Sequence, residues 1–409
     1  MRPVILTIGT RGDVQPFIAL ALGLRAAGHQ PLLVAPEPFR VLVTSFGVEF
    51  AAFPGDPAAL IQRLVDRGGG LMAIPQMIDF AMPVARHVMR AAIETTRDAD
   101  IILASFLIAV GGYQAARQHR VPFLSAQLFP AFTPTSAFAM PGLPSGALVF
   151  NRLTHQISTM LFWTLSLAAY QMLKRQAPEL PRRLENPFGR SLRTIYGFSP
   201  QVVPSPPDWD AHTVVTGYWF LDTHPTWMPP AELQDFLAAG EPPLYIGFGS
   251  MRTVEAERIY SIVIDALTRL NQRAILMGEW KKVGGSRLPA HILRMEAAPH
   301  DWLFERVAAV VHHGGAGTTA AGLRAGRPSL IIPFTADQPF WGQRILAAGV
   351  GPRPIPVKRL TAQSLLAAIE TMREDTAMRM RAADLGTALR AEDGIGNAVR
   401  VIESIAAGS

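Results

Sequence analysis

Short apolar runs alternate with longer segments of helical periodicity along most of the chain. Runs such as residues 2–8 and 32–34 are too short for helices and are typical of buried parallel strands. The segment after the first run, residues 14–27, places its apolar side chains on one helical face: Phe17, Leu20, Ala21 and Leu24. Repeated alternation of this kind predicts an α/β fold in which helices cover both faces of parallel sheets.

The strand–turn–helix pattern begins twice, at residue 2 and again at residue 244. Residues 244–250 lead into a glycine turn and a helix over 255–270, as residues 2–8 lead into their own turn and helix. The intervening segment contains five prolines and little periodicity, which predicts a linker. We therefore expect a first domain over 1–220, a linker over 221–243, a second domain over 244–390, and a segment over 391–409 whose helix could pack back on the first domain.

The composition narrows the classes of partner and chemistry. Apolar residues make up 49% of the 409 residues, which is enough for two large cores. The net charge is +6, but the basic residues are scattered, so an anionic small substrate or an anionic membrane surface fits better than nucleic acid. The chain has no cysteine, which excludes disulfides, thiolate chemistry and cysteine-ligated zinc. The apolar run at the N-terminus is too short for a signal peptide, so we expect a cytoplasmic protein.

A Pro- and Phe-rich stretch, residues 129–144, interrupts the alternation, and an uncharged segment over 157–173 follows it. The stretch is either a packed connection or one wall of an apolar substrate pocket. The uncharged segment is close to the lower length limit of a membrane span, but its Ser and Thr residues favour a helix that is buried or lines a pocket. The candidate acceptor-binding residues are Phe129, Phe132, Phe138, Met140 and Trp163.

The apolar run over 307–312 ends in two histidines and a glycine-rich turn. The turn reads His312-His313-Gly314-Gly315-Ala316-Gly317-Thr318, and a helix-permissive segment follows it to Ala325. A strand that passes through a glycine turn into a helix presents free backbone N–H groups and a positive helix end to an anion. Adjacent side chains in an extended segment point to opposite faces, so we expect one of the two imidazoles to face the anion, without knowing which.

A second strand, residues 329–333, leads to Asp337 and Gln338. Because the carboxyl ends of parallel strands meet at one edge of a sheet, this carboxylate and amide should lie beside the histidine turn. The sequence therefore predicts a site that combines an anion-binding turn with hydrogen-bonding side chains.

Taken together, these blocks resemble the GT-B glycosyltransferases, in particular the family-1 branch with sterol glucosyltransferases and glycopeptide-antibiotic glycosyltransferases. The resemblance covers nearly the whole chain. It is carried by several ordered blocks: Gly9 to Pro16, Thr133-Pro134-Thr135, Asn151-Arg152-Leu153, Thr216 to Trp219, Gly249-Ser250, Pro299 to Leu303, His312 to Thr319, and Pro333 to Trp341.

The resemblance implies two facing Rossmann-like domains with a cleft between them, and inverting transfer of a sugar, usually glucose from UDP-glucose, to an acceptor hydroxyl. The UDP-sugar is a co-substrate bound mainly by the second domain, and no metal or other cofactor is expected. The first domain binds a lipophilic acceptor, and peripheral membrane contact is consistent with such an acceptor.

The resemblance also assigns the donor-binding residues block by block. Gly249, Ser250 and the turn from His312 to Thr318 would hold the diphosphate, and Asp337 and Gln338 would bind the sugar hydroxyls. The nucleobase would lie near Ala298 and His300. Because Ala297 stands where many plant members carry a base-stacking Trp, Trp280 is the candidate for that stacking.

Asp13 is the predicted general base. Its local sequence alone favours an ordinary helix N-cap, and the resemblance reverses that preference. A carboxylate is a weak base, but it can accept the proton late, once the hydroxyl bonds to an oxocarbenium-like carbon. Thr10 and Arg11 lie on the same turn and are further donor-binding candidates, with Arg11 either pairing with Asp13 or reaching the donor phosphates.

The Asp-x-Asp motifs at 98–100 and 208–210 match a metal-binding pattern of the other glycosyltransferase fold, but neither has the context of a metal site, so no metal is predicted. Two alternatives remain at this point. A nucleotide-sugar 2-epimerase of the same fold would act on the donor without any acceptor. A non-catalytic protein that binds UDP-sugar or lipid would use the same turns without turnover.

Overall fold

The computed structural model describes residues 1–53, 88–144, 146–176, 180, 183–189, 192–249, 256–278 and 288–408. The chain divides into two compact units. Unit 1 comprises Met1–Pro200, Pro204–Leu221 and Asp393–Ser409, and unit 2 comprises Gln201–Val203 and Asp222–Glu392. Each unit is an α/β structure built on one parallel sheet, as the sequence alternation predicts.

The sheet of unit 1 has seven strands in the order β3-β2-β1-β4-β5-β6-β7, and all neighbouring pairs are parallel. Its strands are β1 (Pro3–Leu6), β2 (Leu32–Pro36), β3 (Glu49–Phe53), β4 (Ile101–Ala104), β5 (Phe123–Gln127), β6 (Thr194–Tyr196) and β7 (Thr213–Val215). Strand β1 pairs with β2 on one side and β4 on the other, so the strand order reverses at β1. Open α/β sheets bind ligands outside the carboxyl ends of the strands at such a switch point.

Among the described residues, the helices of unit 1 are α1 (Arg11–Ala26), η1 (Glu37–Phe39), α2 (Arg40–Ser45), η3 (Phe106–Ile108), α5 (Ala109–His119), α6 (Leu148–Gln176), η4 (Pro187–Gly189) and α14 (Gly394–Ala407). Helix α6 extends beyond both ends of the uncharged segment over 157–173. Among the described residues, no helix is long and apolar enough to span a membrane.

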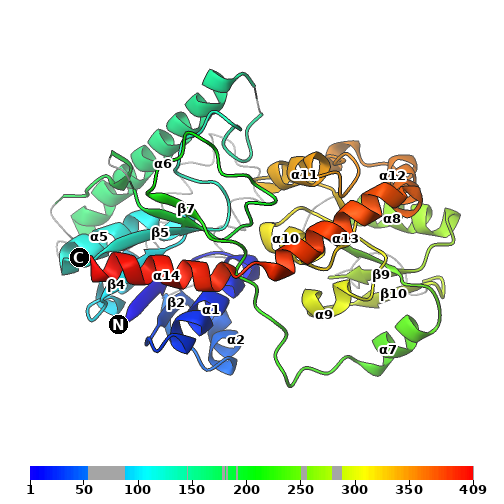
Figure 1. Ribbon diagram of the computed structural model, residues 1–409, viewed down its shortest axis with the longest axis horizontal. Helices are drawn as coiled ribbons and strands as arrows, with labels where there is room; N and C mark the ends of the chain where they lie inside the picture. The colour runs from blue at the N-terminus through cyan, green and yellow to red at the C-terminus, as the bar shows by residue number, and fades with distance from the viewer. Residues whose placement is uncertain are drawn as a thin grey trace. The chain divides into compact units, whose positions relative to one another are not determined.

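The C-terminal helix α14 packs against α1 (Figure 1). A Cβ at Gly23 would overlap Ile395, so the two helices approach closely at that glycine. Gly394 and Gly396 form the first turn of α14. Asp393 caps that turn by accepting a hydrogen bond from the Gly396 N–H at 2.8 Å.

The sheet of unit 2 has five parallel strands in the order β10-β9-β8-β11-β12. The strands are β8 (Leu244–Gly247), β9 (Ala274–Met277), β10 (Ile292–Met295), β11 (Ala309–His312) and β12 (Ser329–Ile331). Its order reverses between β8 and β11, so the carboxyl ends of these two strands form the switch point.

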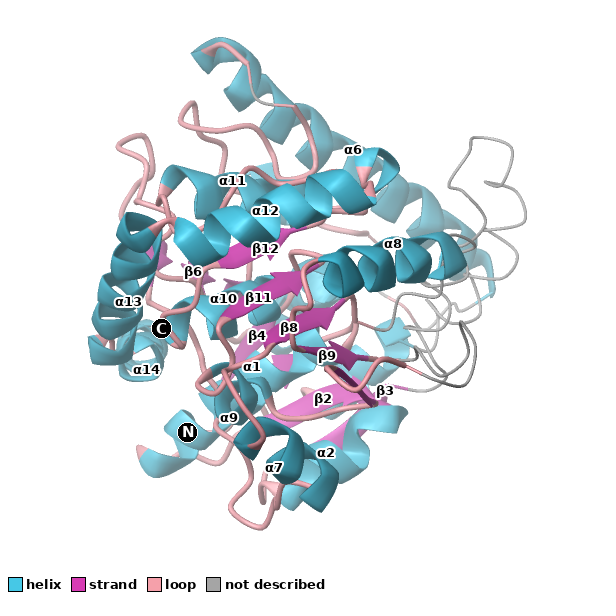
Figure 2. Cartoon of the chain, turned by 90° about the vertical axis from the view of Figure 1, so that its right-hand side faces the viewer, coloured by secondary structure: helices cyan, strands magenta, loops and turns pink. Residues whose placement is uncertain are grey.

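Helices cover both faces of the second sheet. Figure 2 shows α8 (Ala256–Arg269) and α12 (Ala362–Glu374) on one face, where they bury apolar side chains against β8. The opposite face packs on α7 (Ala231–Ala238), α9 (His300–Phe304) and α10 (Ala316–Arg324). The remaining helices are α11 (Gln338–Ala347), η6 (Val357–Arg359) and α13 (Thr376–Ala391). The predicted linker therefore contains α7, whose Leu233 is fully buried in the core of this unit.

Candidate active-site residues

Asp13 lies in the first turn of α1, just after β1 at the switch point of the first sheet. Helix α1 begins at Arg11 with Thr10 as its N-cap, so the expectation that Asp13 caps the helix is wrong. As the third helical residue, Asp13 reaches back instead. Its Oδ2 accepts hydrogen bonds from the Thr10 N–H at 2.7 Å and the Thr10 hydroxyl at 2.9 Å. The carboxylate folds over Gly9, where a Cβ would overlap it and where φ is +150°.

The environment of Asp13 suits a proton acceptor. Burial raises the pKa of its carboxyl group, because desolvation penalises the anion by more than the two Thr10 donors favour it. The side chain nevertheless keeps part of its surface accessible to solvent. Arg11 is exposed and forms no ion pair with Asp13, which leaves the carboxylate free of a competing cation on its own turn.

The histidine turn lies at the switch point of the second sheet, where His312 pairs with Gly247 across β11 and β8. The side chain of His312 is fully buried, and its Nδ1 accepts a hydrogen bond from the Gly314 N–H at 3.1 Å. This contact holds the turn in the left-handed conformation that Gly314 adopts, with φ of +94°. His312 therefore shapes the turn from inside.

His313 is placed differently. Its ring keeps some exposure and lies between Gly249 and Gly315, because a Cβ on Gly249 would lie 3.2 Å from its Cε1 and one on Gly315 would lie 2.6 Å from its Nε2. Gly315 is the N-cap of α10, and a Cβ at the exposed Gly317 would meet nothing within 4 Å. The start of α10 is thus open beside the His313 ring, and its first N–H groups are available to an anion.

Both imidazoles are neutral near pH 7. Burial lowers the pKa of His313 to about 4, although a hydrogen bond to the Gly247 carbonyl opposes the shift. Burial and the neighbouring His313 and His300 lower the pKa of His312 well below its ordinary value. An anion at this turn would therefore meet hydrogen-bond donors and a helix N-terminus rather than a charged imidazole.

Asp337 and Gln338 lie beside the same turn. A Cβ on Gly314 would lie 3.0 Å from the Gln338 carbonyl oxygen. Gln338 Oε1 accepts hydrogen bonds from the Phe334 N–H at 2.8 Å and the Thr335 N–H at 3.1 Å, which leaves its NH₂ group for another acceptor. Asp337 is oriented by the Trp341 Nε1–H, which donates to its Oδ2 at 2.8 Å. The sequence analysis did not predict this role of Trp341. Its position four residues after Asp337 in a helical segment could have indicated the contact, because side chains at that spacing are neighbours on a helix.

The residues predicted near the nucleobase follow β10 at the carboxyl edge of the same sheet. His300 stacks on Phe304 with ring centroids 4.6 Å apart, and its Nε2 lies 3.1 Å from the Tyr245 hydroxyl. Ala298 is partly exposed next to them. Tyr245 is a second residue that the sequence reasoning missed. Ser250 and Trp280 lie outside the described residues, so their predicted roles stay predictions.

Unit 1 contains a cavity of about 480 Å³ that is lined on one side by α6. Two predicted acceptor residues, Phe132 and Trp163, line it. The other three do not line it: Phe129 and Met140 pack in the same apolar cluster as Phe132, and Phe138 packs on His155 and Trp209. The cavity also has polar lining that the sequence reasoning missed, including Arg152, Gln156, Asn186, Asp208 and Asp210.

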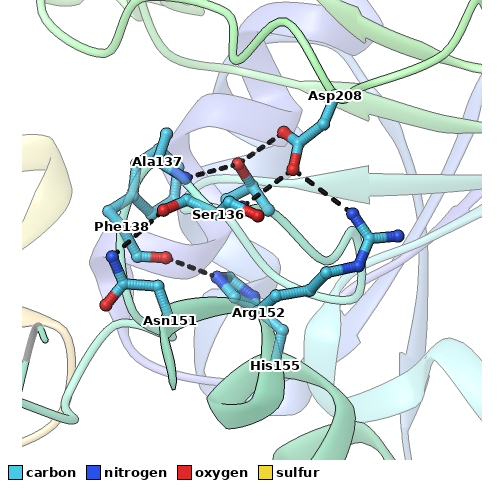
Figure 3. A network of polar contacts seen from close by, with 8 residues as sticks. Ser136, Ala137, Phe138, Asn151, Arg152, His155 and Asp208 are labelled. Atoms are coloured by element: carbon cyan, nitrogen blue, oxygen red, sulfur yellow. Dashed lines mark hydrogen bonds and ion pairs between the residues drawn. The ribbon is translucent and has the colours of Figure 1, made fainter. Parts of the chain in front are cut away.

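Asp208 binds the loop that carries Phe132 and Phe138 (Figure 3). Its carboxylate accepts hydrogen bonds from the Thr135 hydroxyl at 2.7 Å and the Ser136 N–H at 2.8 Å, and Arg152 approaches it at 3.3 Å. These partners give the 208–210 motif a structural role. In the other motif, Asp100 accepts a hydrogen bond from the Arg2 N–H at 2.6 Å. Within the described ranges, no group of three or more His, Asp or Glu residues is placed to hold a metal ion.

Comparison with known proteins identifies the family. Residues 4–132 match the glycosyltransferase family 28 N-terminal domain, and residues 261–398 match the erythromycin biosynthesis protein CIII-like C-terminal domain. The O-mycaminosyltylonolide 6-deoxyallosyltransferase of Streptomyces fradiae is 37% identical over 98% of this chain and 97% of its own length. The chain belongs to the family-1 type glycosyltransferases. The family that the sequence blocks predict is thereby confirmed.

Other relatives of this glycosyltransferase chain are larger proteins. The sterol 3-beta-glucosyltransferase UGT80A2 of Arabidopsis thaliana is 37% identical over 98% of the chain, which spans 65% of that protein. The sterol 3-beta-glucosyltransferase of Neurospora crassa is 36% identical over 98% of the chain, which spans 27% of it. The chain therefore corresponds to one part of these curated sterol enzymes.

Solved glycosyltransferase structures share the fold. The glycosyltransferase of kitacinnamycin superposes with a TM-score of 0.73 at 20% identity, covering 99% of this chain and 98% of that one. The spinosyn forosaminyltransferase SpnP also gives 0.73, at 15% identity, covering 100% and 99%. These neighbours confirm the prediction of a GT-B fold with two parallel-sheet, Rossmann-like domains.

Proposed function

We propose that this chain is an inverting glycosyltransferase that moves a hexose, specifically glucose, from a UDP-sugar to a hydroxyl of a lipophilic acceptor. The observation that carries the proposal is the histidine turn at the switch point of unit 2. It combines an open helix N-terminus, a partly exposed neutral imidazole and the Asp337–Gln338 pair within one short stretch of surface. A nucleoside diphosphate linked to a hydroxyl-rich sugar matches these groups in charge and hydrogen bonding.

The donor diphosphate would bind the N–H groups at the start of α10, with His313 rather than His312 as the imidazole beside it. His312 is fully buried and engaged by Gly314, whereas His313 borders the open side of the turn. The helix N-terminus would stabilise the departing diphosphate, so the proposed reaction needs no metal. Gln338 NH₂ and the Asp337 carboxylate would orient the sugar hydroxyls.

The nucleotide is proposed to be uridine diphosphate. The curated relatives include sterol 3-beta-glucosyltransferases, which favours a glucose donor. Two structures of the same fold, SsfS6 and VinC, contain thymidine diphosphate, so a thymidine diphosphate sugar is the alternative donor. Competition between the two nucleotides for the free protein would separate these donors.

Asp13 would act as the general base, and the cavity of unit 1 would hold the acceptor. The raised pKa of Asp13 brings its carboxylate closer in basicity to the hydroxyl it must deprotonate. Phe132, Trp163 and Met160 give the cavity an apolar lining that suits the body of a sterol, terpenoid or polyketide. We propose a cytoplasmic enzyme that takes such an acceptor through peripheral membrane contact.

The test is incubation of the protein with UDP-glucose and a panel of sterol, terpenoid and polyketide alcohols. Acceptor-dependent release of UDP, with a β-linked product, is the expected result. Conversion of UDP-glucose without an acceptor would favour a 2-epimerase. Tight UDP binding with no turnover for any acceptor would favour a non-catalytic binding protein.

A further inference from the structure

Helix α6 turns an apolar face toward solvent. From residue 149 to residue 165 the exposed apolar residues of one face recur at spacings of three and four, so they form a continuous stripe, and Met172 lies two turns further along. The exposed apolar members, which we call the α6 stripe, are Val149, Phe150, Leu153, Ile157, Met160, Leu161, Leu165 and Met172. Their exposed fractions range from 37% for Met172 to 81% for Val149. A contiguous apolar surface of this size marks a binding face.

The opposite face of the same helix is buried and partly polar, and hydrogen bonds fix it in place (Figure 3). Asn151 donates to the Ser136 carbonyl at 3.1 Å, Thr154 accepts from the Met140 N–H at 2.9 Å, and His155 contacts the Phe138 carbonyl at 3.1 Å. All three side chains are less than 10% exposed. Rotation of α6 to bury the stripe would leave these polar groups without partners, so the outward apolar face is built into the fold.

The segment that contains the stripe has no acidic residue. From Ile101 to Pro178 the sequence contains no Asp or Glu, although the whole chain has 32 of them. The helix ends in Lys174 and Arg175, whereas Arg152 near its start already faces the Asp208 carboxylate at 3.3 Å. An apolar helix face that ends in cations and carries no carboxylate of its own is complementary to the surface of an anionic bilayer.

We propose that the α6 stripe docks on an anionic lipid surface, with the helix lying along the interface. This proposal adds a membrane-docking surface to the proposed function. It rests on that function only in assuming a lipophilic acceptor. Met160 belongs both to the stripe and to the lining of the cavity in unit 1, so the docked face adjoins the acceptor cavity. A lipophilic acceptor could then pass from the bilayer to the cavity along one helix.

A second copy of the chain is the weaker occupant of this face. A parallel pair of helices would bring Lys174 and Arg175 of the two copies together, and an antiparallel pair would place them beside Arg152 of the other copy, which Asp208 already engages. An anionic bilayer instead places phosphate groups opposite Lys174 and Arg175.

The experiment is co-sedimentation of the full chain with vesicles of phosphatidylcholine, with or without phosphatidylglycerol. We expect binding to the anionic vesicles that weakens as salt is added. Val149→Glu should lower the partition coefficient about tenfold. Val41→Glu is the matched control, because Val41 lies on α2 outside the stripe, with an exposed fraction of 79% against 81% for Val149. Both variants should keep the wild-type thermal midpoint.

Three results would overturn the docking proposal: no binding to anionic vesicles, equal losses for the two variants, or a dimer in light scattering that Val149→Glu dissociates. UDP release with a water-soluble acceptor tests the proposed function independently of docking. This release should be unchanged in Val149→Glu. If the wild-type chain released no UDP, the proposed function would be wrong, while vesicle binding would still support the docking proposal.

Discussion

Replacement of Asp13 by Asn tests the proposed base with the least structural disturbance. The carboxylate accepts two hydrogen bonds from Thr10 through one oxygen, Oδ2. An asparagine oxygen can occupy the same position and accept both, but the amide cannot take up a proton. We therefore expect Asp13→Asn to keep its fold and its affinity for UDP while losing turnover.

The two effects differ enough in size to be separated. General-base catalysis contributes roughly 10²- to 10⁴-fold, or about 3–5 kcal/mol of barrier. The unfolding free energy of Asp13→Asn should not fall, because both hydrogen bonds persist and the neutral amide lacks the desolvation penalty of the buried carboxylate. Asp13→Ala removes the acceptor for both Thr10 donors and should lose about 1 kcal/mol of stability as well as the turnover.

The assay measures UDP release at saturating UDP-glucose and acceptor, with UDP affinity by calorimetry and stability by urea denaturation on the same preparations. Thr10→Val is the control on the same turn. It removes one of the donors that lower the pKa of Asp13, so the acidic limb of the kcat/KM profile should move to higher pH while the maximum rate persists. If Asp13→Asn turned over within tenfold of wild type, Asp13 would not be the base.

Three further predictions concern unit 2. Because the pKa of His313 falls from 6.5 in the unfolded chain to about 4 in the fold, the unfolded state binds more protons between these values. Stability should therefore decline as the pH drops from 7 to 5, less steeply in His313→Gln, as followed by the urea midpoint. Gly315→Ala, whose Cβ would overlap the His313 ring, should weaken UDP binding about tenfold by calorimetry, whereas Gly317→Ala should fold normally because its Cβ meets open space. Gln338→Glu keeps an acceptor for both backbone donors, loses the NH₂ group and adds a negative charge beside the diphosphate turn, so KM for UDP-glucose should rise at least several-fold and the affinity for UDP should fall by less.

The positions of the two predicted sites follow from features that a sequence contains. A short apolar run before Gly9, and another before His312, each predict a parallel strand and a turn at its carboxyl end. Strand order is not visible in such runs, so the sequence could not show that both turns lie at switch points. The N-cap of α1 was misplaced because Asp13 is as good a cap as Thr10 on local propensity. In the structure Thr10 is the N-cap, and the Asp13 side chain folds back over Gly9, where only glycine leaves room for it.

The different roles of the two adjacent histidines depend on tertiary contacts. Alternation along a strand assigns their side chains to opposite faces, but it does not say which face carries the ligand. His312 is fully buried and holds the Gly314 N–H, while the space beside His313 is kept open by glycines from two separate segments, Gly249 and Gly315. The glycine spacing within the turn predicts an anion site. That Gly249, which follows β8, lies beside this turn depends on the pairing of β8 with β11, which the sequence does not show.

The α6 stripe shows the converse limit of pattern reasoning. Apolar side chains at helical spacing ordinarily indicate the face that packs on the core, and by that rule Val149 and Leu161 would be buried. At the start of this helix polar groups hold the inner face, where Asn151, Thr154 and His155 contact backbone groups of the loop before it. The cost of leaving such groups unpaired exceeds the gain from burying one more aliphatic side chain, so hydrogen bonding sets the orientation of the helix. Apolar periodicity therefore identifies a helix face that is favourable to bury. Whether that face packs on the core or on another surface depends on which polar groups the fold has to satisfy.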